Sequence, residues 1–145
     1  MKNERKNERG FSMIELLIVV AIATLIAAIA IPNLKKARQS ASSASAVQSM
    51  RTLTTAEQMY RQKFQVYGTL DLLAPEGTLD TVLRTGTKSS YQFSIELAAD
   101  QLHYTCTAAP IEDISTMTYY FTDESTVIRF NYGAPADVSS SPIPR

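Results

Sequence analysis

The chain has few of the residues from which catalytic and metal sites are built. Its 145 residues include one cysteine, Cys106, and one histidine, His103. A single cysteine cannot form an intrachain disulfide, so packing must hold the fold together. We expect Cys106 to be a small buried apolar residue, with an intermolecular bridge as the alternative. His103 falls on the polar side of a predicted strand, where a lone histidine is usually only solvated.

Glycine-rich phosphate loops, nucleophile motifs and metal-ligand clusters are also absent. The acidic pairs at residues 112–113 and 123–124 lack the alternating ligands of a calcium loop, so solvated turns explain them better. The sequence therefore predicts no enzyme activity, no catalytic residue, no bound metal and no cofactor.

Neither sign of charge is in excess, since 14 Lys and Arg balance 14 Asp and Glu. The balance is uneven along the chain. Residues 1–10 contain four basic and two acidic residues, a net charge of +2, which leaves −2 for the remainder. Phosphate binding needs clustered Lys and Arg, so nucleic acid is not expected as a general partner.

A membrane-length apolar run occupies residues 11–31, interrupted only by Ser12, Glu15 and Thr24. As a helix, such a run reaches about 32 Å, which matches the roughly 30 Å hydrocarbon core of a bilayer. No secretory cleavage site follows it. The basic segment before the run predicts a cytoplasmic N-terminus and a C-terminal part outside the cytoplasm.

Glu15 places a carboxylate just inside this apolar run. A carboxylate in hydrocarbon costs roughly 2.5–3.5 kcal/mol, so an intramembrane Glu predicts a functional role and a partner. The partner that we expect is an amine on another copy of the chain, which would make the protein a subunit of a larger assembly.

The rest of the chain predicts one helix followed by a sheet. Residues 33–64 contain no Gly or Pro, which favours helix. Apolar residues recur there on one face, with Glu57 as a polar exception in phase: Ala46, Met50, Leu53, Tyr60 and Phe64. A second series of apolar residues, spaced three apart from Ala41 to Met59, winds around the helix and does not stay on one face. It indicates either contacts with neighbouring subunits or incidental alanines.

Strict alternation of apolar and polar residues begins after residue 90 and predicts half-buried strands at 91–97, 102–108, 117–121 and 128–132. Before it, residues 69–74 and 78–84 resemble short helical turns, with Thr69 and Thr78 as candidate N-caps. The predicted fold class is α+β, a long N-terminal helix packed on a small antiparallel β-meander of about four strands. The predicted segments are a leader at 1–10, a transmembrane helix at 11–32, an amphipathic helix at 33–64, a loop at 65–90, a sheet at 91–133 and an irregular tail at 134–145.

Two stretches of this sequence carry a resemblance to a known family. They are Gly10-Phe11-Ser12-Met13-Ile14-Glu15-Leu16-Leu17-Ile18-Val19-Val20-Ala21, which opens the apolar run, and Ile29-Ala30-Ile31-Pro32-Asn33-Leu34, which closes it. Together they resemble the N-terminus of type IV pilins and pseudopilins. A long helix backing a small antiparallel sheet is also the architecture of that family.

The resemblance implies cleavage between Gly10 and Phe11 by a prepilin peptidase, with methylation of the new N-terminal Phe11. It implies that Glu15 is essential for assembly and that Pro32 contributes to partial unwinding of the helix in the filament. Many pilins have a Gly midway along this run, where the present chain has Ala23-Thr24-Leu25. Unwinding is therefore less strongly favoured here than in those pilins.

The function implied is that of a structural subunit of a type IV pilus, a helical homo-oligomer. Its precursor would lie in the inner membrane, and the pilus assembly machinery would carry it to the cell surface. The alternatives are a pseudopilin of a type II secretion system, a minor pilin, and, more distantly, a signal-anchored extracytoplasmic binding module. An anchor would tolerate Leu at position 15 and would need no Gly-Phe junction. An enzyme with an unrecognised site is the last alternative.

Overall fold

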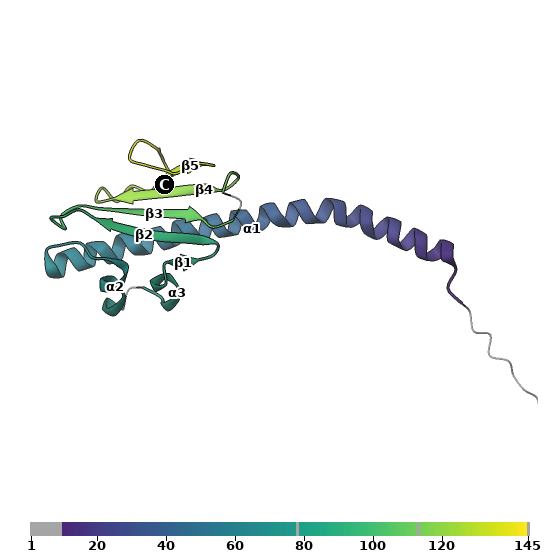
Figure 1. The fold of residues 1–145 in the computed structure, drawn as a ribbon, viewed down its shortest axis with the longest axis horizontal. Coiled ribbons are helices and arrows are strands. Elements are labelled where there is room, and N and C mark those ends of the chain that lie inside the picture. The colour runs from purple at the N-terminus through teal and green to yellow at the C-terminus, as the bar shows by residue number, and fades with distance from the viewer. Residues whose placement is uncertain (1–9, 78, 113, 145) are drawn as a thin grey trace, which may run out of the picture. The chain divides into compact units, whose positions relative to one another are not determined.

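One long helix leads into a sheet in this protein. The computed structural model describes residues 10–77, 79–112 and 114–144 (Figure 1). Helix α1 (Met13–Phe64) has 52 residues and runs through two compact parts of the chain, Met1–Arg38 and Gln39–Arg145. Each part is described by itself.

The sheet contains six antiparallel strands, each paired with the next along the chain. The strands are β1 (Thr87–Lys88), β2 (Tyr91–Leu97), β3 (Tyr104–Pro110), β4 (Thr118–Asp123), β5 (Arg129–Tyr132) and β6 (Ser141–Pro142). Figure 1 shows the C-terminal half of α1 lying along this sheet. The predicted α+β class, a long helix on an antiparallel meander, is therefore confirmed.

The number of strands is larger than the four that the sequence predicts. The two additional strands, β1 and β6, are two residues long and lie at the edges, within segments expected to be loop and tail. A two-residue strand is too short to show alternation in the sequence. It forms because a neighbouring strand is already in place, with Lys88 opposite Tyr91 and Ser141 opposite Phe130.

The core lies between one face of α1 and the inner face of the sheet. Ala46, Met50 and Leu53 are fully buried, as the apolar stripe predicts. The stripe ends sooner than expected, since Tyr60 is only half-buried and Phe64 is 45% exposed. Because α1 extends past the core here, its last turn contributes little to packing.

Large residues of β2 face small residues of β3. Phe93 is opposite Ala108, and Ile95 is opposite Cys106. Pairing large with small residues lets α1 pack closely on the sheet, as a protein interior requires. Cys106 is free and buried, with its thiol 3.7 Å from the sulfur of Met50, so its predicted role as a small buried apolar residue is confirmed.

Three short helical segments follow α1: α2 (Leu70–Leu73), the 3-10 helix η1 (Ala74–Glu76) and α3 (Thr81–Arg84). Thr69 precedes α2 but makes no side-chain cap, and Thr78 lies outside the described residues. Asp80 caps α3 instead, because its Oδ1 accepts the Leu83 N–H at 2.6 Å. Lys88 donates to the other oxygen at 2.5 Å, and these two contacts lower the pKa of Asp80.

Two glycines have similar backbone angles, but we expect an added methyl group to destabilise the fold by different amounts at the two positions. Gly133 (φ 71°) and Gly77 (φ 76°) both adopt the left-handed conformation, which costs other residues about 1–2 kcal/mol. A Cβ at position 133 would lie 2.9 Å from the Ser115 carbonyl oxygen, whereas position 77 is open. We expect Gly133→Ala to lower the free energy of unfolding by about 3 kcal/mol and Gly77→Ala by about 1 kcal/mol.

Urea unfolding of the detergent-solubilised chain, followed by near-ultraviolet circular dichroism, measures this difference. Equal losses in the two variants would show that the close approach of Gly133 to Ser115 does not constrain the fold.

Candidate functional site

The first part of α1, residues 13–34, is mostly apolar and exposed, and Lys35, Lys36 and Arg38 follow it. Its large side chains have between 51% and 86% of their surface accessible: Met13, Ile14, Leu16, Leu17, Ile18, Val19, Val20, Ile22, Leu25, Ile26, Ile29, Ile31 and Leu34. Burying one such side chain stabilises a protein by about 1.5–3 kcal/mol. By length and composition this is the one helix of the described chain that could cross a membrane. The surface requires lipid or other protein to cover it.

Gly10 and Phe11 lie immediately before this helix. Both are exposed, Phe11 by 70%, and a Cβ at Gly10 would meet no atom within 4 Å. Ser12 accepts the first helical hydrogen bond, from the Leu16 N–H to its carbonyl at 3.2 Å. The peptide bond between Gly10 and Phe11 is therefore accessible from the surroundings. The remainder of the predicted leader, residues 1–9, lies outside the described residues.

Glu15 lies in the first turn of α1. A carboxylate is favoured there by the partial positive charge at a helix N-terminus. Its side chain is exposed and makes no hydrogen bond or ion pair with any residue that the structure describes. Within one chain, the fold therefore leaves the charge of this carboxylate without a cation among the described residues.

Pro32 lies inside α1, which continues on both sides of it. A proline removes one backbone donor and crowds the preceding turn, so this is the weakest point of the helix interior. Thr24, where many pilins have Gly, donates its hydroxyl to the Ala21 carbonyl at 2.9 Å. The helix of a single chain is intact here, and unwinding within a filament stays a prediction.

A second notable carboxyl group, that of Glu57, lies buried beneath the sheet. Its Oε2 accepts the Gly68 N–H at 3.0 Å, and its Oε1 has no partner among the described atoms. Burial raises the pKa of Glu57 to about 7, and the Gly68 hydrogen bond lowers it only in part. The sequence placed Glu57 on the buried face, but no local signal pointed to Gly68 as its partner.

The Glu57 carboxyl group holds the chain that leaves α1. Next to Gly68, the ring of Tyr67 packs at a tilt against that of Tyr104, with centroids 4.6 Å apart, and Arg61 lies over the Tyr67 ring at 4.7 Å. A Cβ at Gly68 would approach the Tyr60 ring to 3.2 Å. These contacts fix the start of the segment that leads to α2.

The remaining polar candidates form no reactive site within the described residues. His103 is exposed just before β3 and pairs with Glu124 at 2.9 Å. Burial raises the pKa of the Cys106 thiol, which keeps it protonated and unreactive. No group of three or more His, Cys, Asp or Glu that could hold a metal ion occurs in the part of the chain that the structure describes, and Asp113 lies outside it.

Comparison with known proteins finds similarity at the N-terminal part of the chain and to one pilus component. Residues 5–31 match the prokaryotic N-terminal methylation motif. The chain is also 39% identical over 56 residues to the type IV wide pilus major component PilA4 of Thermus thermophilus. That match covers 39% of this chain and 43% of the relative, so the chain spans less than half of the relative's length. No solved structure matches. The resemblance to the type IV pilin superfamily is thus confirmed.

The raised pKa of Glu57 predicts a loss of stability as the pH rises. The carboxyl group is protonated in both states below its unfolded pKa of 4.5, and it ionises in the folded protein only near pH 7. Between these values the unfolded state releases a proton that the folded state keeps. The free energy of unfolding should therefore fall by up to about 3 kcal/mol between pH 4.5 and 8.

Glu57→Gln tests this assignment, because the amide can still accept the Gly68 hydrogen bond but cannot ionise. Urea unfolding at pH 4.5 and pH 8 should show a much smaller decline for this variant than for the wild type. Glu96→Gln, at an exposed position of β2, should retain the full decline. The assignment is wrong if Glu57→Gln and the wild type lose the same stability.

Proposed function

We propose that the protein is a structural subunit of a type IV pilus, made as a precursor in the inner membrane. One observation carries the proposal. The first part of α1, residues 13–34, is mostly apolar and exposed, with a single carboxylate, Glu15, in its first turn. Such a helix has two stable environments, the bilayer before assembly and the interior of a helical filament afterwards.

Cleavage between Gly10 and Phe11 is the step that prepares the chain for assembly. In the precursor the nitrogen of Phe11 is an amide and carries no charge. After a prepilin peptidase removes residues 1–10, that nitrogen becomes an amine, which remains cationic after methylation. Cleavage thus creates a cation four residues from Glu15, at the end of the apolar helix.

The new amine of one copy then pairs with the Glu15 carboxylate of its neighbour. In a low-dielectric filament core, an ion pair that loses one partner costs about 3–5 kcal/mol, because the remaining charge is buried alone. Any axial offset that fails to join the two groups incurs this cost. The pair therefore fixes the offset between neighbouring helices, while apolar contacts, which lipid tails could replace almost equally well, cover the rest of the helix surface.

The part of the chain from Gln39 onward forms the head, which we place at the filament surface, outside the cytoplasm. The match to a major pilus component supports a major subunit over a pseudopilin or minor pilin. The role is structural: the pilus assembly machinery supplies the work of extraction from the membrane.

Glu15→Leu should insert into the membrane normally and fail to assemble. The change removes the carboxylate that we pair with the amine and leaves the amine unpaired, so the yield of sheared filaments should fall at least roughly a hundredfold. The yield is measured in a bacterium that assembles type IV pili and lacks its own major pilin. Thr24→Leu is the matched control, since it replaces another polar residue of the run, and it should assemble.

If Glu15→Leu gives as many filaments as the wild type, the pairing mechanism is wrong. Wild-type protein that is processed but remains in the envelope would instead favour the pseudopilin or minor-pilin alternative.

Gly10→Leu should block processing without disturbing the fold, because a Cβ at this exposed position would meet no described atom within 4 Å. The intact mass of the membrane-extracted protein should then include all ten leader residues and lack the methyl group. Ser12→Ala, on the other side of the junction, should be cleaved and methylated like the wild type. Normal processing of Gly10→Leu would show that the peptidase does not read this glycine.

A further inference from the structure

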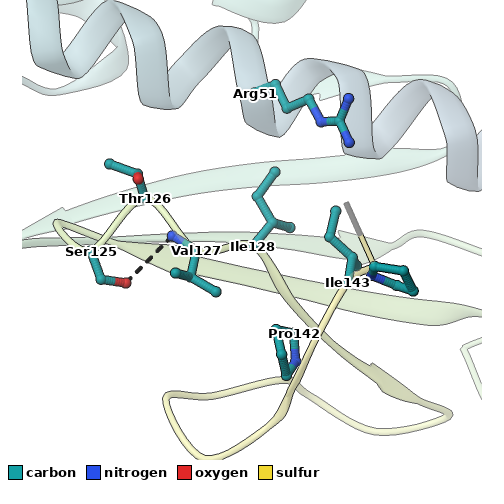
Figure 2. A pocket seen from close by; sticks show the side chains of 8 residues that line it. Arg51, Ser125, Thr126, Val127, Ile128, Pro142 and Ile143 are labelled. Atoms are coloured by element: carbon teal, nitrogen blue, oxygen red, sulfur yellow. Dashed lines mark hydrogen bonds between the residues drawn. The ribbon is translucent and has the colours of Figure 1, made fainter.

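An apolar groove of about 690 Å³ lies between α1 and the last strands of the sheet (Figure 2). Its apolar walls are Val127 and Ile128 from the β4–β5 connection and Pro142, Ile143 and Pro144 from the C-terminal segment, and the polar residues Ser125 and Thr126 also line it. Figure 2 shows Arg51 extending from α1 over the side of the groove that holds Ile128 and Ile143. The groove lies entirely within the part of the chain that begins at Gln39.

Arg51 is the one charged residue among those that line the groove. Its guanidinium group is exposed and has no hydrogen bond or ion pair with any residue in the described ranges. An arginine beside an apolar surface favours an occupant with a carboxylate and apolar side chains on either side of it.

The adjacent sheet edge cannot be extended by a strand from another chain. The edge strand β6 is two residues long, and Pro142 within it and Pro144 just after it have no N–H to donate. Prolines at an edge prevent another strand from extending the sheet. The occupant must therefore bind through its side chains.

The connection between β3 and β4 has the complementary chemistry. Ile111 and Ile114 are 50% and 57% exposed, although both are large and apolar. Glu112 lies between them, is exposed, and has no partner within the described part of the chain. In the sequence the two isoleucines flank the acidic pair Glu112-Asp113, of which Asp113 lies outside the described residues. Exposed isoleucines beside the Glu112 carboxylate match an apolar groove with one arginine.

The loop and the groove lie at opposite ends of the sheet, because consecutive connections of an antiparallel meander alternate between its two ends. Gln39 donates to Thr116 at 3.3 Å, which places the β3–β4 connection beside the start of this part of α1. Arg51 is twelve residues further along the helix, or about 18 Å. One head can therefore offer both surfaces to different neighbours.

We propose that the groove binds the β3–β4 connection of a second copy of this chain, with Glu112 of that copy against Arg51. This inference rests on the proposed filament function. The contact joins two different surfaces, so it is heterologous and repeats from copy to copy, as a helical filament requires.

Cysteine cross-linking in assembled filaments tests the contact. The double variant Val127→Cys with Ile114→Cys is treated with copper phenanthroline in air. Each disulfide releases two electrons, which reduce Cu(II) to Cu(I) and pass on to oxygen, and two protons, which are taken up as oxygen is reduced. A repeating contact should give a ladder of covalent oligomers on a non-reducing gel, whereas a twofold contact would stop at dimers. Each single variant is a control, and Cys106 adds no background because it is buried.

Charge reversal tests the pairing of Arg51 with Glu112. Arg51→Glu should lower the filament yield roughly tenfold, because it places two carboxylates together. Adding Glu112→Arg should restore most of that yield. Arg84→Glu, at an exposed position of α3, makes the same change in net charge and should assemble like the wild type.

Failure of this contact is distinguishable from failure of the filament function. Filaments of the double variant that give no ladder, or a disulfide that joins position 127 to a segment other than the β3–β4 connection, would overturn the inference and leave the pilus function intact. The same holds if Arg51→Glu and Arg84→Glu assemble equally well. If the wild-type chain forms no filaments and keeps its leader, as we expect of Gly10→Leu, both the pilus function and the contact are overturned.

Discussion

The exposed apolar surface of α1 is the constraint on which the rest of this protein depends. A dozen or so large aliphatic side chains on the helix have more than half of their surface uncovered. Each would favour burial by about 1.5–3 kcal/mol. Lipid tails and the aliphatic side chains of other helices cover such a surface almost equally well, so apolar contact alone does not choose between membrane and filament. The choice falls to polar groups that only one environment can satisfy, and Glu15 is the one carboxylate of the apolar run.

The head is held together without a covalent cross-link, and its core tolerates one unusual polar group. Met50, Leu53 and the inner residues of β2 and β3 form a continuous apolar core. Glu57 is fully buried at the C-terminal end of the helix face that packs on it. A buried carboxyl group costs stability when it ionises. In return, its hydrogen bond to Gly68 fixes where the chain leaves α1, which an apolar residue at this position could not do.

The sequence predicts the parts of this fold that follow from local patterns. The apolar run, the buried stripe of α1 and the longer strands each repeat a pattern over several residues, and the burial of Glu57 follows from its phase. The edge strands β1 and β6 are too short for a pattern, and α3 is capped by Asp80, two residues after the predicted Thr78. The groove at Arg51 joins three distant segments, so only the tertiary structure reveals it. Gly10, Phe11, Glu15 and Pro32 remain predictions, because one chain shows their positions and not their partners.

The two contacts that we propose, one in the filament core and one between heads at its surface, differ in kind. They would suit a filament that forms at the membrane and persists outside the cell. The pair that we propose between Glu15 and a neighbouring amine would be buried in the core, where salt would screen it little, and it would set the offset between subunits. The proposed contact at Arg51 would lie at the surface, where an ion pair contributes only about 0–1 kcal/mol and is screened by salt. The surface contact therefore cannot drive assembly by itself. Because it would recur at every subunit, it could still select the one arrangement of heads that is consistent with the offset proposed for the core.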